Sequence, residues 1–135
     1  MNIIYADQHH LDYLLEHDNH ISEVMLKRKL AAREVLVVQN DDNSVLGWLR
    51  FGYFWDEIPF MNLIYLVKSY RQRGIGRKLV GFWEAEMKAQ GHSMVMTSTL
   101  SDEQAQHFYR KLGYKDAGSL LLKNEALEIL FTKLL

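Results

Sequence analysis

The chain has 135 residues, of which 48% are hydrophobic and only one is proline. This composition is typical of a globular protein, and the length suffices for an apolar core, so we expect residues 1–135 to form a single domain. The chain has no cysteine, which excludes disulfides, thiolate metal sites and a cysteine acyl-enzyme. Its net charge of −1 argues against a general nucleic-acid binder.

Nothing in the sequence indicates a membrane or secretory segment. No apolar run approaches the roughly 20 residues of a membrane span. The N-terminus has no basic segment leading into an apolar stretch, as a secretory signal would. We therefore expect a cytoplasmic protein without a membrane partner.

The N-terminal part is expected to contain a short strand over 2–6 and two helices over 8–17 and 20–33. Asp7 is a candidate N-cap for the first helix, and Asp18 is interpreted as part of the turn between the helices. Spacing predicts that the apolar stripe of the second helix consists of Ile21, Val24, Met25 and Leu30.

Four histidines in this part raise the question of a metal site: His9, His10, His17 and His20. No acidic or thiolate companion stands at ligand spacing from them. Solvated helix ends are therefore the favoured interpretation, and no metal is expected.

Three strands are expected next. The first covers 35–39, and a dense turn signal over 40–44 joins it to a long second strand over 45–54. After a turn over 55–59, the third strand covers 60–67. The first two strands are predicted to form a hairpin.

A long amphipathic helix over 74–90 follows, ends at Gly91 and leads to a strand over 93–98. Ser101 and Gln104 have the spacing of a capping box that would open a fourth helix.

The end of the chain is expected to hold two more strands. Gly113 would close the fourth helix, because glycine adopts the left-handed conformation that often ends helices. Strand candidates then lie around 114–122 and 127–134. The expected order is therefore strand, two helices, three strands, helix, strand, helix, two strands.

The segment 71–77 carries the clearest chemical signal, since it joins a strand to the amphipathic helix. Backbone N–H groups in the first turn of a helix have no internal partner and attract anions. Gly74 and Gly76 lack a Cβ, so a diphosphate can approach the backbone closely. Arg71, Arg73 and Arg77 add positive charge. The alternative is a helix that starts after a flexible turn with solvated arginines.

Two common phosphate loops do not fit this segment. A P-loop needs Gly-Lys followed by Ser or Thr, whereas Gly76 is followed by Arg77 and Lys78. A dinucleotide fingerprint needs Gly or Ala three residues after Gly76, where the chain has Leu79. What remains is Arg-x-x-Gly-x-Gly, which resembles the coenzyme A diphosphate loop, Gln/Arg-x-x-Gly-x-Gly/Ala, of the GNAT superfamily of N-acetyltransferases.

A second motif strengthens this resemblance. Family members commonly carry Asn-x-x-Ala-x-x-Phe-Tyr on the helix after the fifth strand, followed by Gly-Phe or Gly-Tyr. The same register here holds Ala105, Phe108 and Tyr109, then Gly113 with Tyr114. Asp102 stands in the place of the usual asparagine. An ionised carboxylate cannot donate a hydrogen bond to the pantetheine arm, so Asp102 is left out of the predicted site.

The resemblance implies an α/β fold with a mixed, mostly antiparallel central sheet of about seven strands flanked by four helices. It also implies acetyl-coenzyme A as acyl donor and direct attack of a primary amine on its thioester. In this fold the fourth and fifth strands splay apart, so backbone groups of Leu66 and Val67 would bind pantetheine like an added strand. The diphosphate would be held by Arg71, Gln72, Arg73, Gly74, Ile75, Gly76 and Arg77.

Tyr109 would protonate the departing thiolate in such a mechanism, since a phenol can share its proton with sulfur as charge develops. The alternative role of Tyr109 is core filler on an apolar helix stripe. The base that accepts the amine proton is left open among Glu57, Asp56 and a water chain.

The resemblance therefore predicts an N-acetyltransferase whose acceptor is a small-molecule or peptide amine. A non-catalytic acyl-coenzyme A binder of the same fold is the first alternative. A nucleic-acid contact domain built on the arginines is the second, and the near-neutral net charge counts against it. The sequence leaves the oligomeric state open, a homodimer included.

Overall fold

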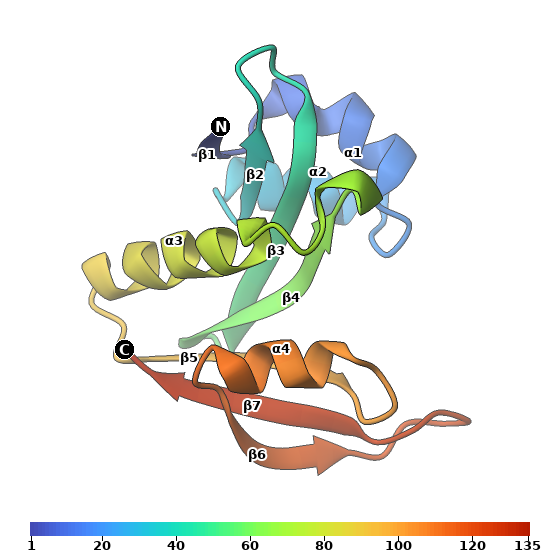
Figure 1. The fold of residues 1–135 in the computed structure, drawn as a ribbon, viewed down its shortest axis with the longest axis vertical. Helices are drawn as coiled ribbons and strands as arrows, with labels where there is room; N and C mark the ends of the chain where they lie inside the picture. The colour runs from blue at the N-terminus through green and yellow to red at the C-terminus, as the bar shows by residue number, and fades with distance from the viewer. The chain divides into compact units, whose positions relative to one another are not determined.

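The structure, a computed structural model, describes residues 1–135 and contains seven strands and four α-helices (Figure 1). The first elements are β1 (Asn2–Tyr5), the 3₁₀ helix η1 (Gln8–His10), α1 (Leu11–His17), α2 (Glu23–Ala31), β2 (Val35–Gln39) and β3 (Val45–Phe54). They are followed by β4 (Ile58–Leu66), the 3₁₀ helix η2 (Lys68–Tyr70), α3 (Ile75–Ala89), β5 (Met94–Leu100), α4 (Ala105–Lys111), β6 (Lys115–Leu120) and β7 (Glu128–Leu134). No helix is long and apolar enough to span a bilayer.

The strands form one sheet in the order β1-β2-β3-β4-β5-β7-β6. Neighbouring strands β1–β2, β2–β3, β5–β7 and β6–β7 are antiparallel, whereas β4 and β5 are parallel and pair Phe60 with Met96. This arrangement confirms the predicted fold class, a mixed and mostly antiparallel sheet with four helices.

The residues group into two compact units. Unit 1 holds residues 1–51 and 63–80, and unit 2 holds residues 52–62 and 81–135. The strands β3 and β4 and the helix α3 each contribute residues to both units. That the whole chain is a single domain stays a prediction.

The core of unit 1 lies where α1 and α2 pack on β2 and β3. Leu14, Leu26 and Leu30 are buried in one cluster with Val35, Val37 and Trp48. The stripe predicted for α2 is wrong at two positions, because Val24 is 61% and Met25 43% exposed. The helix begins only after Ser22, whose hydroxyl caps it by accepting from the Met25 N–H, and its phase turns Leu26 and Leu30 inward.

Asp18 lies in the connection between α1 and α2, as predicted, and is also a buried anchor between the helices and the sheet. It is only 5% exposed, and its carboxylate accepts hydrogen bonds from Arg50 Nε at 2.7 Å and Trp48 Nε1 at 3.1 Å. Both donors lie on β3, and Arg50 is itself 6% exposed. The ion pair therefore fastens the α1–α2 connection to the middle of β3.

The strands β3 and β4 approach each other unusually closely at Gly47. A Cβ at this position would lie 2.5 Å from the Tyr65 carbonyl oxygen and 2.6 Å from Leu66 Cδ2. Such distances are far below van der Waals contact, and one of the two atoms is backbone. Only glycine fits at position 47 without displacing β4.

Unit 2 packs α4 beside the antiparallel strands β5, β7 and β6 (Figure 1). The predicted capping box is wrong, since α4 begins only at Ala105 and Gln104 makes no side-chain cap. Gln106 instead donates from its side-chain amide to the carbonyls of Ser101 and Glu103. These bonds hold residues 101–104 as a turn ahead of the helix.

The predicted glycine helix ends are confirmed. Gly91 has φ +97°, and the His92 N–H reaches back to the Met87 carbonyl at the end of α3. Gly113 has φ +94°, and the Tyr114 N–H reaches back to the Tyr109 carbonyl. Each bond has the spacing of a Schellman motif, which satisfies carbonyls that the helix leaves without a partner.

Replacing Asp18 with asparagine is expected to lower the free energy of unfolding by about 3–5 kcal/mol, because Arg50 would keep a buried charge without its partner. Urea unfolding monitored by tryptophan fluorescence measures the change. Asp12→Asn on the exposed side of α1 is the control and should alter stability by less than about 0.5 kcal/mol. Equal stability of the two variants would show that the ion pair does not anchor the helices.

Candidate functional site

The first turn of α3 has the geometry of an anion site. The first intrahelical bond runs from the Lys78 N–H to the Gly74 carbonyl at 3.1 Å. The N–H groups of Ile75, Gly76 and Arg77 precede that bond and therefore lack a carbonyl partner inside the helix. Together with the helix dipole they favour a phosphate at this end of α3.

The loop before α3 depends on one glycine for its conformation. Gly74 has φ +78°, which L side chains rarely adopt, and no atom lies within 4 Å of a Cβ built there. The requirement at position 74 is therefore conformational and not steric. Gln72 also has a positive φ of 61°, so the loop turns sharply twice before the helix begins.

Positive side chains surround this loop. Arg71, Arg73 and Arg77 are all exposed, and none of them takes part in the chain's ion pairs. The Arg71 guanidinium lies 5.2 Å from the centre of the Tyr65 ring, and that of Arg73 lies 5.5 Å from the Tyr70 ring. The loop thus presents uncompensated cations next to the helix terminus, held in part by aromatic faces.

Leu66 and Val67, the two residues predicted to bind pantetheine at the end of β4, differ in how their backbone groups are bonded. The Val67 N–H donates to the Leu46 carbonyl at 2.8 Å, so it is already used in pairing with β3. Successive residues of a strand point their backbone groups to opposite sides, so those of Leu66 point away from β3. The Leu66 carbonyl accepts from Arg71 Nε at 2.9 Å. Leu66 is therefore better placed than Val67 to meet a ligand.

Tyr109 lies on the buried side of α4, in unit 2. Only 5% of it is exposed, and its ring centre is 5.8 Å from that of Phe131 and 5.9 Å from that of Tyr114. Burial raises the pKa of Tyr109 to about 12, a hydrogen bond with Thr97 opposes the shift, and the carboxylates of Glu103 and Glu128 add to it. The phenol therefore keeps its proton at neutral pH, as a proton donor and a core tyrosine both would.

The acidic candidates for a general base lie at an exposed hairpin tip in unit 2. Trp55 and Asp56 have φ of 57° and 59°, and the Glu57 N–H donates to the Phe54 carbonyl. Two central residues with positive φ are the mark of a type I′ turn. The side chains of Asp56 and Glu57 are exposed, and so is Asp102 in the turn before α4.

The structure thus brings Leu66, Val67 and the whole segment 71–77 together in unit 1. Tyr109 and the acidic candidates belong to unit 2. Among the aromatic residues of β3, Trp48 and Phe51 are each 1% exposed, so they are core residues and cannot line an acceptor pocket, whereas Tyr53 is 38% exposed.

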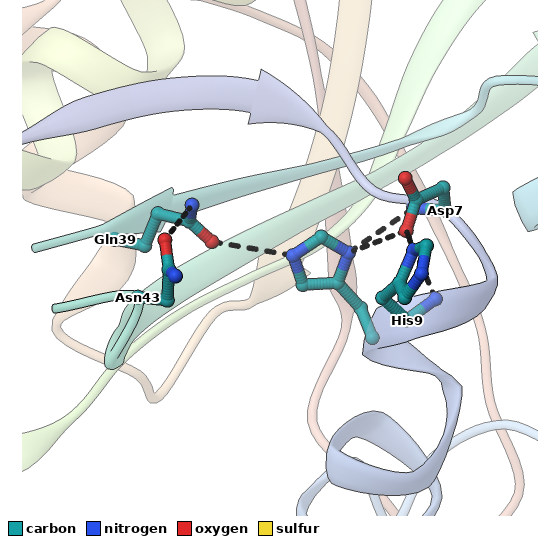
Figure 2. Close-up of polar contacts among 5 residues, drawn as sticks. Asp7, His9, Gln39 and Asn43 are labelled. Atoms are coloured by element: carbon teal, nitrogen blue, oxygen red, sulfur yellow. Dashed lines mark hydrogen bonds and ion pairs between the residues drawn. The ribbon is translucent and has the colours of Figure 1, made fainter. Parts of the chain in front are cut away.

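A cleft in unit 1 was missed by sequence reasoning. It has a volume of about 600 Å³ and is lined by residues of three segments: Asp7, His9, His10, Tyr13, Gln39, Asn43, Ser44 and Val45. Figure 2 shows the polar contacts on its wall. Against the expectation of a solvated histidine, the His10 side chain is only 13% exposed. Nothing local in the sequence signals the cleft, because it is assembled from distant parts of the chain.

Comparison with known families identifies the class of protein. The family profile described as acetyltransferase (GNAT) domain matches residues 31–116, which include the α3 loop and Tyr109. The chain belongs to this family of acetyltransferases. Comparison with curated protein sequences finds no significant match.

Solved structures show the same fold. A GNAT-family acetyltransferase from Bacillus cereus ATCC 10987 has a TM-score of 0.78 and 23% identity, over 98% of this chain and 96% of its own. An aminoglycoside 6'-N-acetyltransferase in complex with coenzyme A has a TM-score of 0.78 and 19% identity, over 99% and 97% of the two chains. The spermidine/spermine N-acetyltransferase SpeG from Vibrio cholerae has a TM-score of 0.76 and 11% identity, over 98% and 91%.

The raised pKa of Tyr109 predicts a loss of stability at alkaline pH. In the unfolded chain the phenol releases its proton near pH 10, whereas in the folded chain it does so near pH 12. The stability that this shift contributes is complete below pH 10 and is lost as the pH rises towards 12. Urea unfolding below and above pH 10 should show a smaller loss for Tyr109→Phe than for the natural chain. Identical losses would contradict the shift.

Proposed function

We propose that this chain is an acetyl-coenzyme A-dependent N-acetyltransferase that moves an acetyl group to a primary amine. The observation that carries the proposal is the first turn of α3, where three N–H groups without a partner in the helix lie beside uncompensated arginines in a chain of the GNAT family. In this proposal Arg71, Gln72, Arg73, Gly74, Ile75, Gly76 and Arg77 hold the diphosphate of coenzyme A. The N–H groups of Ile75, Gly76 and Arg77 bind its oxygens, and the guanidinium groups balance its charge.

The pantetheine arm would be bound by the end of β4. The backbone groups of Leu66 point away from β3 and can pair with a pantetheine amide as an added strand does. The Arg71 side chain would release the Leu66 carbonyl when it turns to the diphosphate. The Val67 N–H already donates to the Leu46 carbonyl, so Val67 would adjoin the pantetheine arm without donating a hydrogen bond to it.

The chemistry would be direct attack of the amine on the thioester, because the chain has no cysteine to carry the acyl group. Most of the rate enhancement would come from holding the two reactants together, which is worth roughly 7–11 kcal/mol for a well-oriented pair. Tyr109 would donate its proton to the thiolate as the carbon–sulfur bond breaks. Its raised pKa keeps the phenol protonated until then. Glu57, Asp56 or a water chain would accept the amine proton.

The acceptor would be a small-molecule or peptide amine. An aminoglycoside acetyltransferase and a spermidine/spermine acetyltransferase share the fold, which supports the amine class without naming the compound. A homodimer and a cytoplasmic location also stay proposals. Sedimentation of the purified chain and fractionation of cells that carry a tagged copy would test them.

A non-catalytic acyl-coenzyme A binder is the second candidate. The observation that favours it is the burial of Tyr109, which is packed among aromatic rings like a core residue. Such a protein would keep the anion site at α3 and lack turnover.

Gly76→Asp is expected to weaken coenzyme A binding at least about tenfold, because it places a carboxylate against the phosphates and charge-assisted bonds there contribute roughly 1.5–3 kcal/mol each. Isothermal titration calorimetry with coenzyme A measures the effect. The matched control is Gly81→Asp, which adds the same side chain on the exposed surface of α3, where no atom lies within 4 Å of a new Cβ.

Because Gly76 is buried, its variant needs a second test of the same site. Arg77→Glu changes an exposed side chain in the same helical turn and should also weaken binding. Unchanged affinity in Arg77→Glu and in a folded Gly76→Asp variant would refute the diphosphate site.

Tyr109→Phe separates the two candidate functions. It should lower acetyl transfer about 100-fold if the phenol acts as general acid, while coenzyme A affinity stays within twofold. Thiol release from acetyl-coenzyme A with a panel of amines measures the rate. Tyr114→Phe is the comparison, since it removes another buried phenol that is bonded to Glu84. Absence of turnover in the natural chain with every amine would favour the binding module.

A further inference from the structure

The cleft of unit 1 lies between η1 and the start of α1 on one side and the β2–β3 hairpin on the other (Figure 2). Its volume of about 600 Å³ is within the range of small-molecule sites. Its lining residues all belong to unit 1. The proposed functions of α3, β4 and Tyr109 make no use of it.

A relay of hydrogen bonds fixes the polar groups of this cleft. The Asp7 backbone N–H donates to His10 Nδ1 at 3.1 Å, so the proton of the neutral ring sits on Nε2. His10 Nε2 then donates to Gln39 Oε1 at 3.2 Å, and Gln39 Nε2 donates to Asn43 Oδ1 at 3.2 Å. Figure 2 shows this line of contacts crossing from η1 to the hairpin. The amides of Gln39 and Asn43 are therefore oriented in advance of any ligand.

The charge of the cleft is negative. No lysine or arginine lines it, and its one carboxylate belongs to Asp7, whose side chain is 62% exposed. Hydrogen bonds from His9 lower the pKa of Asp7, so the group is ionised at neutral pH. The contacts of Asp7 use Oδ1, which leaves Oδ2 able to accept from a ligand. Asp42 lies in the adjoining hairpin turn and adds to the negative field, whereas Asp41 is paired with the N-terminal ammonium group at 3.5 Å.

An aromatic row leads from the cleft towards the end of β4. Tyr13 lines the cleft and stacks on His17, and its ring meets that of Trp48 at 6.0 Å between centres. The Trp48 ring in turn lies 4.7 Å from that of Tyr65 on β4. Tyr65 is 40% exposed and lies beside Leu66, which is proposed to contact pantetheine. A carboxylate next to aromatic faces is the chemistry that recognises an organic ammonium ion.

We propose that this cleft binds an ammonium group of the amine acceptor, with Asp7 as its counter-ion, Tyr13 as its aromatic wall and the oriented amides of Gln39 and Asn43 as further contacts. That the bound amine is the acceptor of the acetyl group rests on the proposed acetyltransferase function. That the cleft binds an amine does not. It implies an acceptor with at least two amino groups, one held in the cleft and one free to react. A linear diamine is the simplest member of that class.

The test measures binding of diaminohexane to the full chain without coenzyme A, by calorimetry at neutral pH and low salt. Hexanediol, of the same length but uncharged, is the ligand control. Asp7→Asn removes the charge and keeps a side-chain oxygen that can still cap η1. It should raise the dissociation constant for diaminohexane at least fivefold. Asp12→Asn makes the same charge change outside the cleft and should stay within twofold of the natural chain.

Ser44→Lys gives a second variant that keeps the inference testable should Asp7→Asn disturb η1. It places a cation on the rim and leaves the Ser44 backbone N–H free to keep its bond to Asp42. It should weaken diaminohexane binding at least tenfold through like-charge repulsion. The inference is overturned if the natural chain does not bind diaminohexane, if hexanediol binds as tightly, or if both cleft variants bind the diamine like the natural chain.

Turnover separates this inference from the proposed function. If the chain acetylates amines, Asp7→Asn should raise the KM for diaminohexane at least fivefold with kcat unchanged, and should leave coenzyme A affinity unchanged. If both cleft variants weaken diamine binding as expected and no amine is acetylated, the assignment of the cleft as an amine site is supported and the acetyltransferase proposal fails. If both cleft variants acetylate amines with the same KM as the natural chain, the acetyltransferase proposal is supported and the assignment of the cleft fails.

Discussion

The buried ion pair between Asp18 and Arg50 is the constraint on which the arrangement of unit 1 depends. A carboxylate and a guanidinium taken out of water cost several kcal/mol each unless they meet, so the α1–α2 connection has one position on β3. Trp48 donates to the same carboxylate and thereby fixes its own ring. The row of rings from Tyr13 to Tyr65 and one wall of the cleft follow from this attachment.

The proposed anion site at α3 depends on a different principle, because it is built from backbone rather than from side chains. Any long helix leaves its first N–H groups unpaired, but most helices cap them with a side chain. At α3 the chain enters through Gly74 in a left-handed conformation, and the surrounding side chains are cationic. The residues that would cap a helix are thus replaced by groups that attract an anion.

Features set by neighbouring residues could be predicted from the sequence. The hairpin turn over 40–44, the glycine helix ends and the strand–loop–helix around Gly74 all follow from local backbone preferences. The predicted capping box failed for a reason that is not local, because the Ser101 N–H that the box needs donates instead to the Leu127 carbonyl.

Contacts between distant residues escaped prediction. Asp18 and Arg50 are 32 positions apart, and His10 and Gln39 are 29 apart. Aspartate is a residue type that is common in turns, and only the fold shows that Asp18 is buried. An arginine that alternates with Trp48 on an otherwise apolar strand was the one signal of a buried acid elsewhere. For the cleft, the pieces come from three segments that no periodicity connects.

The close approach at Gly47 has a consequence for anyone who alters this protein. Gly47 is not itself proposed to touch a ligand, yet any side chain there would push the Tyr65 carbonyl and Leu66, which is proposed to bind pantetheine. It would thereby displace the strand that leads into the loop proposed to bind coenzyme A. Randomised libraries for new acceptors should therefore hold this glycine constant and vary the rim of the cleft. Gly47 maintains the fold, and the short distance between β3 and β4 determines which residues position 47 can hold.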